Sequence, residues 1–200
     1  MRTAPHTGAG RPRDPAVDAR VADAAVRLYG ELGWSGFSVA GVARRAGVGK
    51  ASIYLRWPTK AALLDAALGS QMPAIGDIDT GTVRADLVEL ARQLLHLYAG
   101  DPGRAAIRLG LDGDRIPEIR ERYEALSQSQ VLAARAIVRR AIRRRELPPG
   151  TSVTLLLDAL CGGAVMHALS APPRLRDQVT AGLDAYAEQL VDFLLAATSR

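Results

Sequence analysis

The sequence is poor in the features that mark secreted and disulfide-linked proteins. It has one cysteine, which excludes an internal disulfide framework and any cysteine-rich zinc site and is typical of a reducing compartment. Residues 1–10 contain no apolar segment of the kind found in a signal peptide. We therefore expect a cytoplasmic protein.

Long hydrophobic runs are also missing. Residues 153–169 come nearest, but Asp158 and His167 interrupt them, and the run is shorter than the roughly 20 residues that span a bilayer. The run therefore predicts a buried helix and no membrane partner. Because it is apolar on nearly all sides, a second copy of the chain is its natural cover, and we expect a homodimer formed through the last two helices.

Strand patterns are absent as well. Apolar residues instead recur at helical spacing along most of the chain, and a content of 48% hydrophobic and 24% charged residues is that of a globular protein. The fold class expected is all-α. Helices are predicted at residues 15–32, 59–69, 82–99, 103–111, 117–146, 152–170 and 175–198, with two further short helices between residues 37 and 56.

Lysine is scarce: the chain has 24 arginines and only two lysines, Lys50 and Lys60. A mutational bias toward arginine codons explains most of this ratio. The charge is unevenly placed, because residues 1–60 hold ten Lys/Arg against four Asp/Glu, whereas residues 61–200 hold sixteen against seventeen. This asymmetry favours a phosphate-bearing partner at the N-terminal end.

Composition divides the chain into three parts. Residues 1–13 are rich in Gly, Pro, Arg and Thr and predict a disordered basic arm. Residues 14–70 predict a small helical domain, which begins with Asp14 as a helix N-cap. Residues 71–200 predict a larger helical domain, because the segment after residue 70 is rich in proline, glycine and aspartate.

Residues 37–60 have the pattern of a helix-turn-helix. Ala43 is small where two short helices must cross closely, and Gly47 falls at the turn, where a left-handed backbone conformation costs glycine nothing. Val42, Val48 and Ile53 supply apolar contacts between the helices. The remaining side chains of the second helix are polar, basic or aromatic, which indicates contact with a nucleic-acid backbone.

These residues resemble a known family. Residues 42–49 read Val-Ala-Arg-Arg-Ala-Gly-Val-Gly, and Tyr54, Trp57 and Lys60 follow at three-residue steps. The segment is similar to the TetR family of bacterial transcriptional regulators, whose motif is typically Ile-Ala-x-x-Ala-Gly-Val-Ser followed by Tyr-x-x-Phe-x-x-Lys. Gly49 replaces the family's common serine and removes a helix-capping side chain, although a backbone N–H can still donate there. Trp57 replaces phenylalanine.

The specific match covers about residues 15–69, and beyond it only the number and order of helices agree. The resemblance implies an N-terminal three-helix DNA-binding domain with a helix-turn-helix, followed by a helical C-terminal dimerisation and ligand-binding domain. It also implies a homodimer that binds a pseudo-palindromic double-stranded operator, usually represses transcription, and is released by a small-molecule effector. The alternative is a DNA-binding dimer without an effector, whose C-terminal domain serves only for dimerisation or protein contacts.

The expected DNA-binding residues lie in and around the second helix of the motif. Lys50 is expected to contact guanine or a phosphate, and Ala51 to contact a thymine methyl group. Tyr54 is expected to donate to a phosphate. Lys60 begins a helix, where a cation is disfavoured, so a nearby phosphate would explain it. The full set is Ser38, Arg44, Gly49, Lys50, Ala51, Ser52, Tyr54, Arg56, Trp57, Thr59 and Lys60.

The ligand candidates are apolar or aromatic residues of the helices that enclose the cavity in the family, and they indicate a largely hydrophobic ligand. They are Leu94, Tyr98, Ile107, Tyr123, Leu126, Met166 and His167.

No catalytic, cofactor or metal site is predicted. Cys161 and His167 are six residues apart, about 240° around a helix, and so cannot face each other. A helical enzyme using either residue therefore lacks a second catalytic group. The five arginines between residues 139 and 145 are interpreted as solvated cations near a helix C-terminus.

Overall fold

The structure is a computed structural model that describes residues 14–72, 77–113 and 115–198, and within these ranges it is helical with no strand, as the sequence predicts. The predicted basic arm, residues 1–13, lies outside the described residues. The helices in chain order are α1 (Pro15–Gly36), α2 (Val39–Ala46), α3 (Lys50–Tyr54), α4 (Lys60–Gln71), α5 (Val83–Ala99), α6 (Asp101–Gly113), α7 (Pro117–Arg143), α8 (Val153–Leu169), the 3-10 turn η1 (Pro173–Leu175), α9 (Arg176–Ala181) and α10 (Leu183–Thr198).

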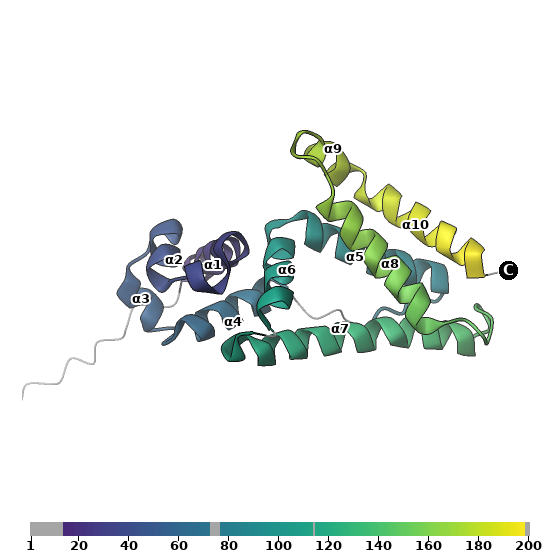
Figure 1. Ribbon diagram of the computed structural model, residues 1–200, viewed down its shortest axis with the longest axis horizontal. Coiled ribbons are helices and arrows are strands. Elements are labelled where there is room, and N and C mark those ends of the chain that lie inside the picture. Colours follow the sequence, from purple (N-terminus) through teal and green to yellow (C-terminus); the bar gives the residue numbers. More distant parts are fainter. Residues whose placement is uncertain (1–13, 73–76, 114, 199–200) are drawn as a thin grey trace, which may run out of the picture.

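The helices form two groups. Figure 1 shows α1, α2 and α3 at one end of the molecule and α8, α9 and α10 at the other. Helix α6 stands between α1 and the second group, and the long α7 runs from beneath α6 to the far end. The N-terminal helices therefore meet the rest of the chain through α4, α6 and the first turns of α7.

Hydroxyl and carboxylate side chains begin several of the helices. Asp14 caps α1 by accepting from the N–H of Ala16 at 3.0 Å, and Thr59 caps α4 by accepting from the N–H of Ala62 at 3.0 Å. Both caps were predicted from the sequence and are confirmed. Each accepts a backbone donor that the helix itself leaves unpaired, which fixes where the helix starts.

Two apolar cores hold the helices together. The first is formed by α1 to α4 together with Ala105 and Leu109 of α6 and Ile119 of α7. The second is formed mainly by α5, α7, α8 and α10. Because α6 and α7 contribute to the first core, the N-terminal helices are joined to the rest by packed apolar surface as well as by the linker, the segment of chain between α4 and α5.

Helix α1 breaks at Gly33, as the sequence predicts: the residue's φ of +65° and ψ of −175° are not helical, and one further turn continues beyond the break to Gly36. Two other helices differ from the prediction. Helix α7 ends at Arg143 rather than near residue 146, and Arg145 adopts a positive φ of 64°. The predicted last helix, residues 175–198, is interrupted at Gly182, where α9 ends. Of these positions only Gly33 has a positive φ at a glycine, a conformation that costs glycine little because it lacks a Cβ.

Candidate nucleic-acid interface

The turn between α2 and α3 has the predicted geometry. Gly47 adopts a left-handed conformation at φ 67° and ψ 37°, and the N–H of Val48 donates to the carbonyl of Ala43 at 3.0 Å. A Cβ at Gly47 would meet nothing within 4 Å, so glycine is required here by backbone conformation rather than by space. Val42 and Ile53 are fully buried and fix the crossing of the two helices.

Helix α3 presents one exposed face. Lys50, Ala51, Ser52 and Tyr54 are exposed, whereas Ile53 between them is buried in the first core. Gly49 caps α3 without a side-chain hydrogen bond, as expected from the missing serine. The exposed face thus combines one cation, one phenol, a hydroxyl and a methyl group, and each matches a group that DNA offers at its backbone or in its major groove.

Leu55 also lies on this face, and the sequence reading missed it. Its side chain is 88% exposed, directly after Tyr54, at the C-terminal end of α3. Ala51 and Leu55 are four residues apart and therefore share one strip of the helix surface. The four-residue spacing between Ala51 and Leu55 could have placed Leu55 on the exposed strip. A leucine is ordinarily interpreted as a core residue, however.

Four of the predicted DNA contacts already have partners inside the domain. Ser38 caps α2 by accepting from the N–H of Gly41 at 3.1 Å, and Thr59 caps α4. Arg56 forms an ion pair with Asp18 of α1 at 3.0 Å. These roles stabilise the domain, and contact of the same residues with phosphate remains a prediction.

Lys60 is the fourth predicted DNA contact that already has partners inside the domain. Its ammonium group donates to the backbone carbonyl of Trp34 at 3.0 Å and lies 3.9 Å from the centroid of the indole ring. A hydrogen bond and a cation–π contact therefore account for a cation at the start of α4 without a phosphate. Arg44, by contrast, is exposed.

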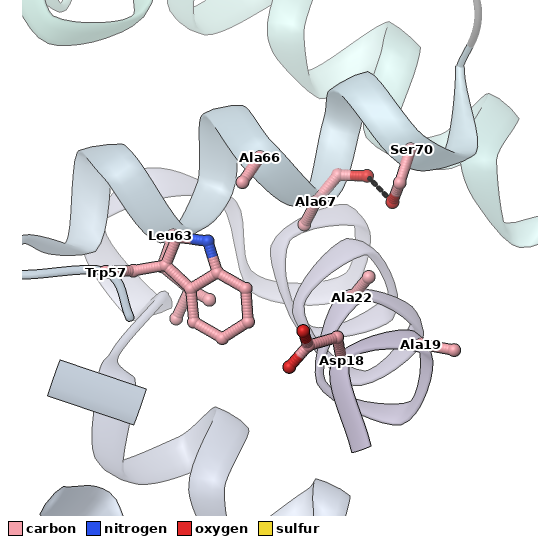
Figure 2. Close-up of a pocket in the computed structure, with 8 residues that line it drawn as sticks. All are labelled: Asp18, Ala19, Ala22, Trp57, Leu63, Ala66, Ala67 and Ser70. Atoms are coloured by element: carbon pink, nitrogen blue, oxygen red, sulfur yellow. Dashed lines mark hydrogen bonds between the residues drawn. The ribbon is translucent and has the colours of Figure 1, made fainter. Parts of the chain in front are cut away.

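Trp57 packs against the first core and lines a hollow of about 290 Å³ between α1 and α4. In Figure 2 the indole lies beside Leu63, with the carboxylate of Asp18 across the hollow. Small side chains of both helices complete the lining, namely Ala19, Ala22, Ala66 and Ala67, with Ser70 at the end of α4. Trp57 therefore packs within the N-terminal domain, next to α1 and α4.

The ligand candidates are divided between interior and surface. Leu94 is buried, and Tyr98, Ile107 and Tyr123 are half-buried. Burial raises the pKa of the Tyr98 phenol, and the nearby Cys161 and Tyr123 raise it further, so these side chains are neighbours. The side chain of Leu126 lies outside the described residues.

Two candidates on α8 have surroundings that the sequence did not predict. Met166 is 62% exposed, so its predicted place in an enclosed cavity is not where the structure puts it. His167 stacks on Tyr186 of α10, with ring centroids 3.5 Å apart and an interplanar angle of 8°.

Burial raises the pKa of the Cys161 thiol to about 11, which keeps it protonated near neutral pH.

The arginine run at the end of α7 is partly misread as solvated. Arg140 is only 14% exposed and pairs with Asp77 at 3.1 Å. Arg144 pairs with Asp79 at 2.7 Å, and this hydrogen bond lowers the pKa of that carboxyl group. Both aspartates lie in the linker before α5, so these arginines attach the linker to α7. Sequence spacing gave no sign of this, because the partners lie more than sixty residues apart.

Helices α8 and α10 expose large apolar side chains. Leu155 of α8 is 70% exposed and Phe193 of α10 is 71% exposed. A groove of about 620 Å³ runs between the two helices and is lined by Leu155, Leu156 and Leu194 among others. This is the surface on which the sequence predicts the dimer contact.

Among the described helices, none combines the length and the apolar character that a membrane-spanning segment needs.

Known proteins match the chain along both groups of helices. Residues 21–67 match the family described as bacterial regulatory proteins, tetR family, and residues 77–194 match the tetracyclin repressor-like C-terminal domain. The HTH-type transcriptional regulator AqdR of Rhodococcus erythropolis is 33% identical over 149 residues, which cover 74% of this chain and 71% of AqdR. The HTH-type regulator YdeS of Bacillus subtilis is 29% identical over 155 residues, covering 76% of this chain and 78% of YdeS.

Solved structures agree on the fold. The transcriptional regulator FadR of Bacillus subtilis, crystallised with stearoyl-CoA, superposes with a TM-score of 0.66 at 22% identity, over 88% of this chain and 96% of that chain. FadR of Bacillus halodurans gives a TM-score of 0.69 at 19% identity, over 92% and 97% of the two chains.

Proposed function

Because the chain belongs to the TetR family of bacterial transcriptional regulators, we propose that it is a homodimeric repressor that a small, largely hydrophobic molecule releases from a pseudo-palindromic operator. The observation that carries the DNA-binding part is the exposed face of α3, where Lys50, Ala51, Ser52 and Tyr54 point away from a core fixed by Ile53. In this motif class the second helix lies in the major groove with its first residues at base edges.

The second subunit of the dimer supplies the recognition helix for the second half-site of the operator. Two recognition helices related by a two-fold axis match half-sites about 34–36 Å apart. The exposed apolar groove between α8 and α10 supports this arrangement, because a monomer rarely leaves large apolar side chains of two helices exposed to water.

Repression is tested in cells with a reporter. Genomic fragments selected by the purified protein, each with the promoter that it contains, are placed upstream of a reporter gene, and the chain is expressed from a second plasmid. A repressor lowers reporter output, whereas an activator raises it. Lys50→Ala serves as the control, because it removes a DNA contact at an exposed position and leaves the core intact.

Leu55 is expected to contribute to the choice of sequence. A side chain so exposed on the recognition helix can cover a thymine methyl group, so Leu55→Ala should weaken operator binding by about fivefold, on the order of 1 kcal/mol of lost apolar contact. Fluorescence anisotropy with the selected duplex measures this. The matched control is Leu32→Ala, an exposed leucine on α1; an equal loss in both variants would remove Leu55 from the interface.

The effector side rests on Leu94, Tyr98, Ile107 and Tyr123 of α5, α6 and α7, of which Leu94 is buried and the other three are half-buried. The first probe is stearoyl-CoA, the molecule held by the structurally similar FadR. Expected is a rise in Tm of a few degrees together with release of the operator. If neither this probe nor a panel of hydrophobic compounds changes Tm, the effector-free alternative is favoured.

A bulkier side chain at one of these candidate positions should abolish that response. Ile107→Trp adds volume to a half-buried position of α6, so the ligand is excluded while operator binding persists. Leu111→Trp adds the same side chain at an exposed position of the same helix and should respond like the wild type. Isothermal titration with the effector distinguishes the two variants, and equal affinities would place the ligand elsewhere.

A further inference from the structure

Trp34 lies where α1 bends, and its backbone is held from two sides. Gly33, at φ +65° and ψ −175°, departs from helical geometry and bends the chain just before Trp34. The N–H of Trp34 donates to the carboxylate of Asp112 at 3.2 Å, and its carbonyl accepts from the ammonium group of Lys60 at 3.0 Å. One residue thus joins two distant parts of the chain.

Asp112 belongs to α6, the helix that packs against α1. It lies near the end of α6, and the same carboxylate oxygen accepts from the hydroxyl of Tyr29 at 3.0 Å. Tyr29 is fully buried in the first core, and burial together with this hydrogen bond raises the pKa of its hydroxyl, which keeps it a donor. Asp112 therefore ties α6 to two positions of α1.

The packing around this link is tight. A Cβ at Gly30 would lie 3.1 Å from the backbone nitrogen of Ala105 and 3.1 Å from the Cβ of Arg104, so α1 and α6 approach as closely as a glycine permits. Figure 1 shows α6 standing between α1 and the second group of helices. A change in the position of α6 must therefore move α1 or break the hydrogen bonds of Asp112.

Lys60 continues the link toward the DNA. It is the first residue of α4 and follows the exposed face of α3 by six residues, counted from Tyr54. The ammonium group holds both the carbonyl and the ring of Trp34. The link thus runs from α6, through the backbone N–H and carbonyl groups of Trp34, to the start of the helix that follows the recognition helix.

We propose that Asp112 is a positioning residue: through the backbone of Trp34 and the side chain of Lys60 it fixes the orientation of the helix-turn-helix relative to α6, and so determines which half-site spacing the dimer accepts. This inference rests on the proposed function, because it presupposes a dimer on a two-part operator. A residue that merely stabilises the fold would affect all spacings equally. Loss of a positioning residue instead changes how much more tightly the dimer binds one half-site spacing than another.

The experiment measures that difference. The probes are the duplex selected by the wild-type protein from a random library and the same duplex with one base pair inserted or deleted between the half-sites. Affinities of the full chain are measured for the wild type, Asp112→Ala, Asp112→Asn and Tyr29→Phe. The control is Asp101→Asn, which removes an exposed ion pair with Arg27, at 3.2 Å, between the same two helices.

The expected result is a loss of spacing preference. The ratio of affinities for the native and altered spacings should fall by about fivefold to tenfold in Asp112→Ala, a size typical of coupling between distant sites, and stay unchanged in Asp101→Asn. Tyr29→Phe should show a smaller fall, since Asp112 keeps its bond to Trp34. Circular dichroism and the oligomeric state are recorded for each variant, and if Asp112→Ala does not fold, Asp112→Asn and Tyr29→Phe decide with the same ratio.

Two results would overturn the proposal. Equal weakening at every spacing would make Asp112 only a stabilising residue, and affinities unchanged at every spacing in folded variants would remove it from the link. Failure of the proposed function looks different: the wild type would then select no paired half-sites and would show no spacing preference to lose.

Discussion

Lys50→Ala is expected to lower operator affinity by roughly 100-fold, because a charged contact to a base or phosphate contributes about 1–3 kcal/mol and the dimer loses it twice. Tyr54→Ala should have a smaller effect of the same sign, since its hydroxyl makes a neutral hydrogen bond. Both side chains are exposed on α3, so the unfolding transition should stay at the wild-type temperature. Anisotropy titrations and thermal unfolding measure the two quantities.

The salt dependence of operator binding by Lys50→Ala also distinguishes a contact of Lys50 with guanine from a contact with phosphate, the two alternatives that the sequence left open. Loss of a phosphate contact reduces the slope of log affinity against log salt by about one per site, hence about two per dimer, and weakens all sequences alike. Loss of a guanine contact relaxes the choice of base at one position of each half-site. The control is Arg139→Ala, an exposed cation on α7; an equal loss there would mean that net charge alone matters.

The second large effect is expected at the surface of α8 and α10. Leu155→Asp combined with Phe193→Asp places one charge on the exposed apolar surface of each helix, where burial against a second subunit would leave both charges unpaired. The chain should then be monomeric, with operator affinity reduced by more than about 100-fold, because the second half-site no longer benefits from effective concentrations near the millimolar range.

Sedimentation equilibrium measures the oligomeric state of this double variant. Leu111→Asp is the control, because Leu111 is a similarly exposed leucine on α6, outside the groove. A double variant that remains a dimer would move the subunit contact to another face. A control that also dissociates would show that added charge, rather than its place, separates the subunits.

Local features of the fold were predictable because their causes lie close together in the sequence. Asp14 and Thr59 cap helices through backbone donors two and three residues away, and Gly47 is needed for a single left-handed turn. The exposed face of α3 follows from the same local rules, since Ile53 must point into the core. Such features need no knowledge of the tertiary structure.

Contacts between distant residues were not predictable. Trp34 finds Lys60 at a separation of 26 residues and Asp112 at 78 residues. Nothing in the sequence near Lys60 distinguishes a partner in the protein from a phosphate on DNA. The exposure of Met166 was missed for a related reason, because α8 is apolar on nearly all sides and its spacing does not tell which side faces the core.

The central claim is that the two copies of α3 recognise a specific operator, and an equilibrium titration tests it most directly. The full chain is titrated into the selected pseudo-palindromic duplex and into a scrambled duplex of the same length and composition, at physiological salt. The account predicts two chains per duplex and at least about 1,000-fold tighter binding to the selected sequence. Equal affinity for both duplexes would contradict it.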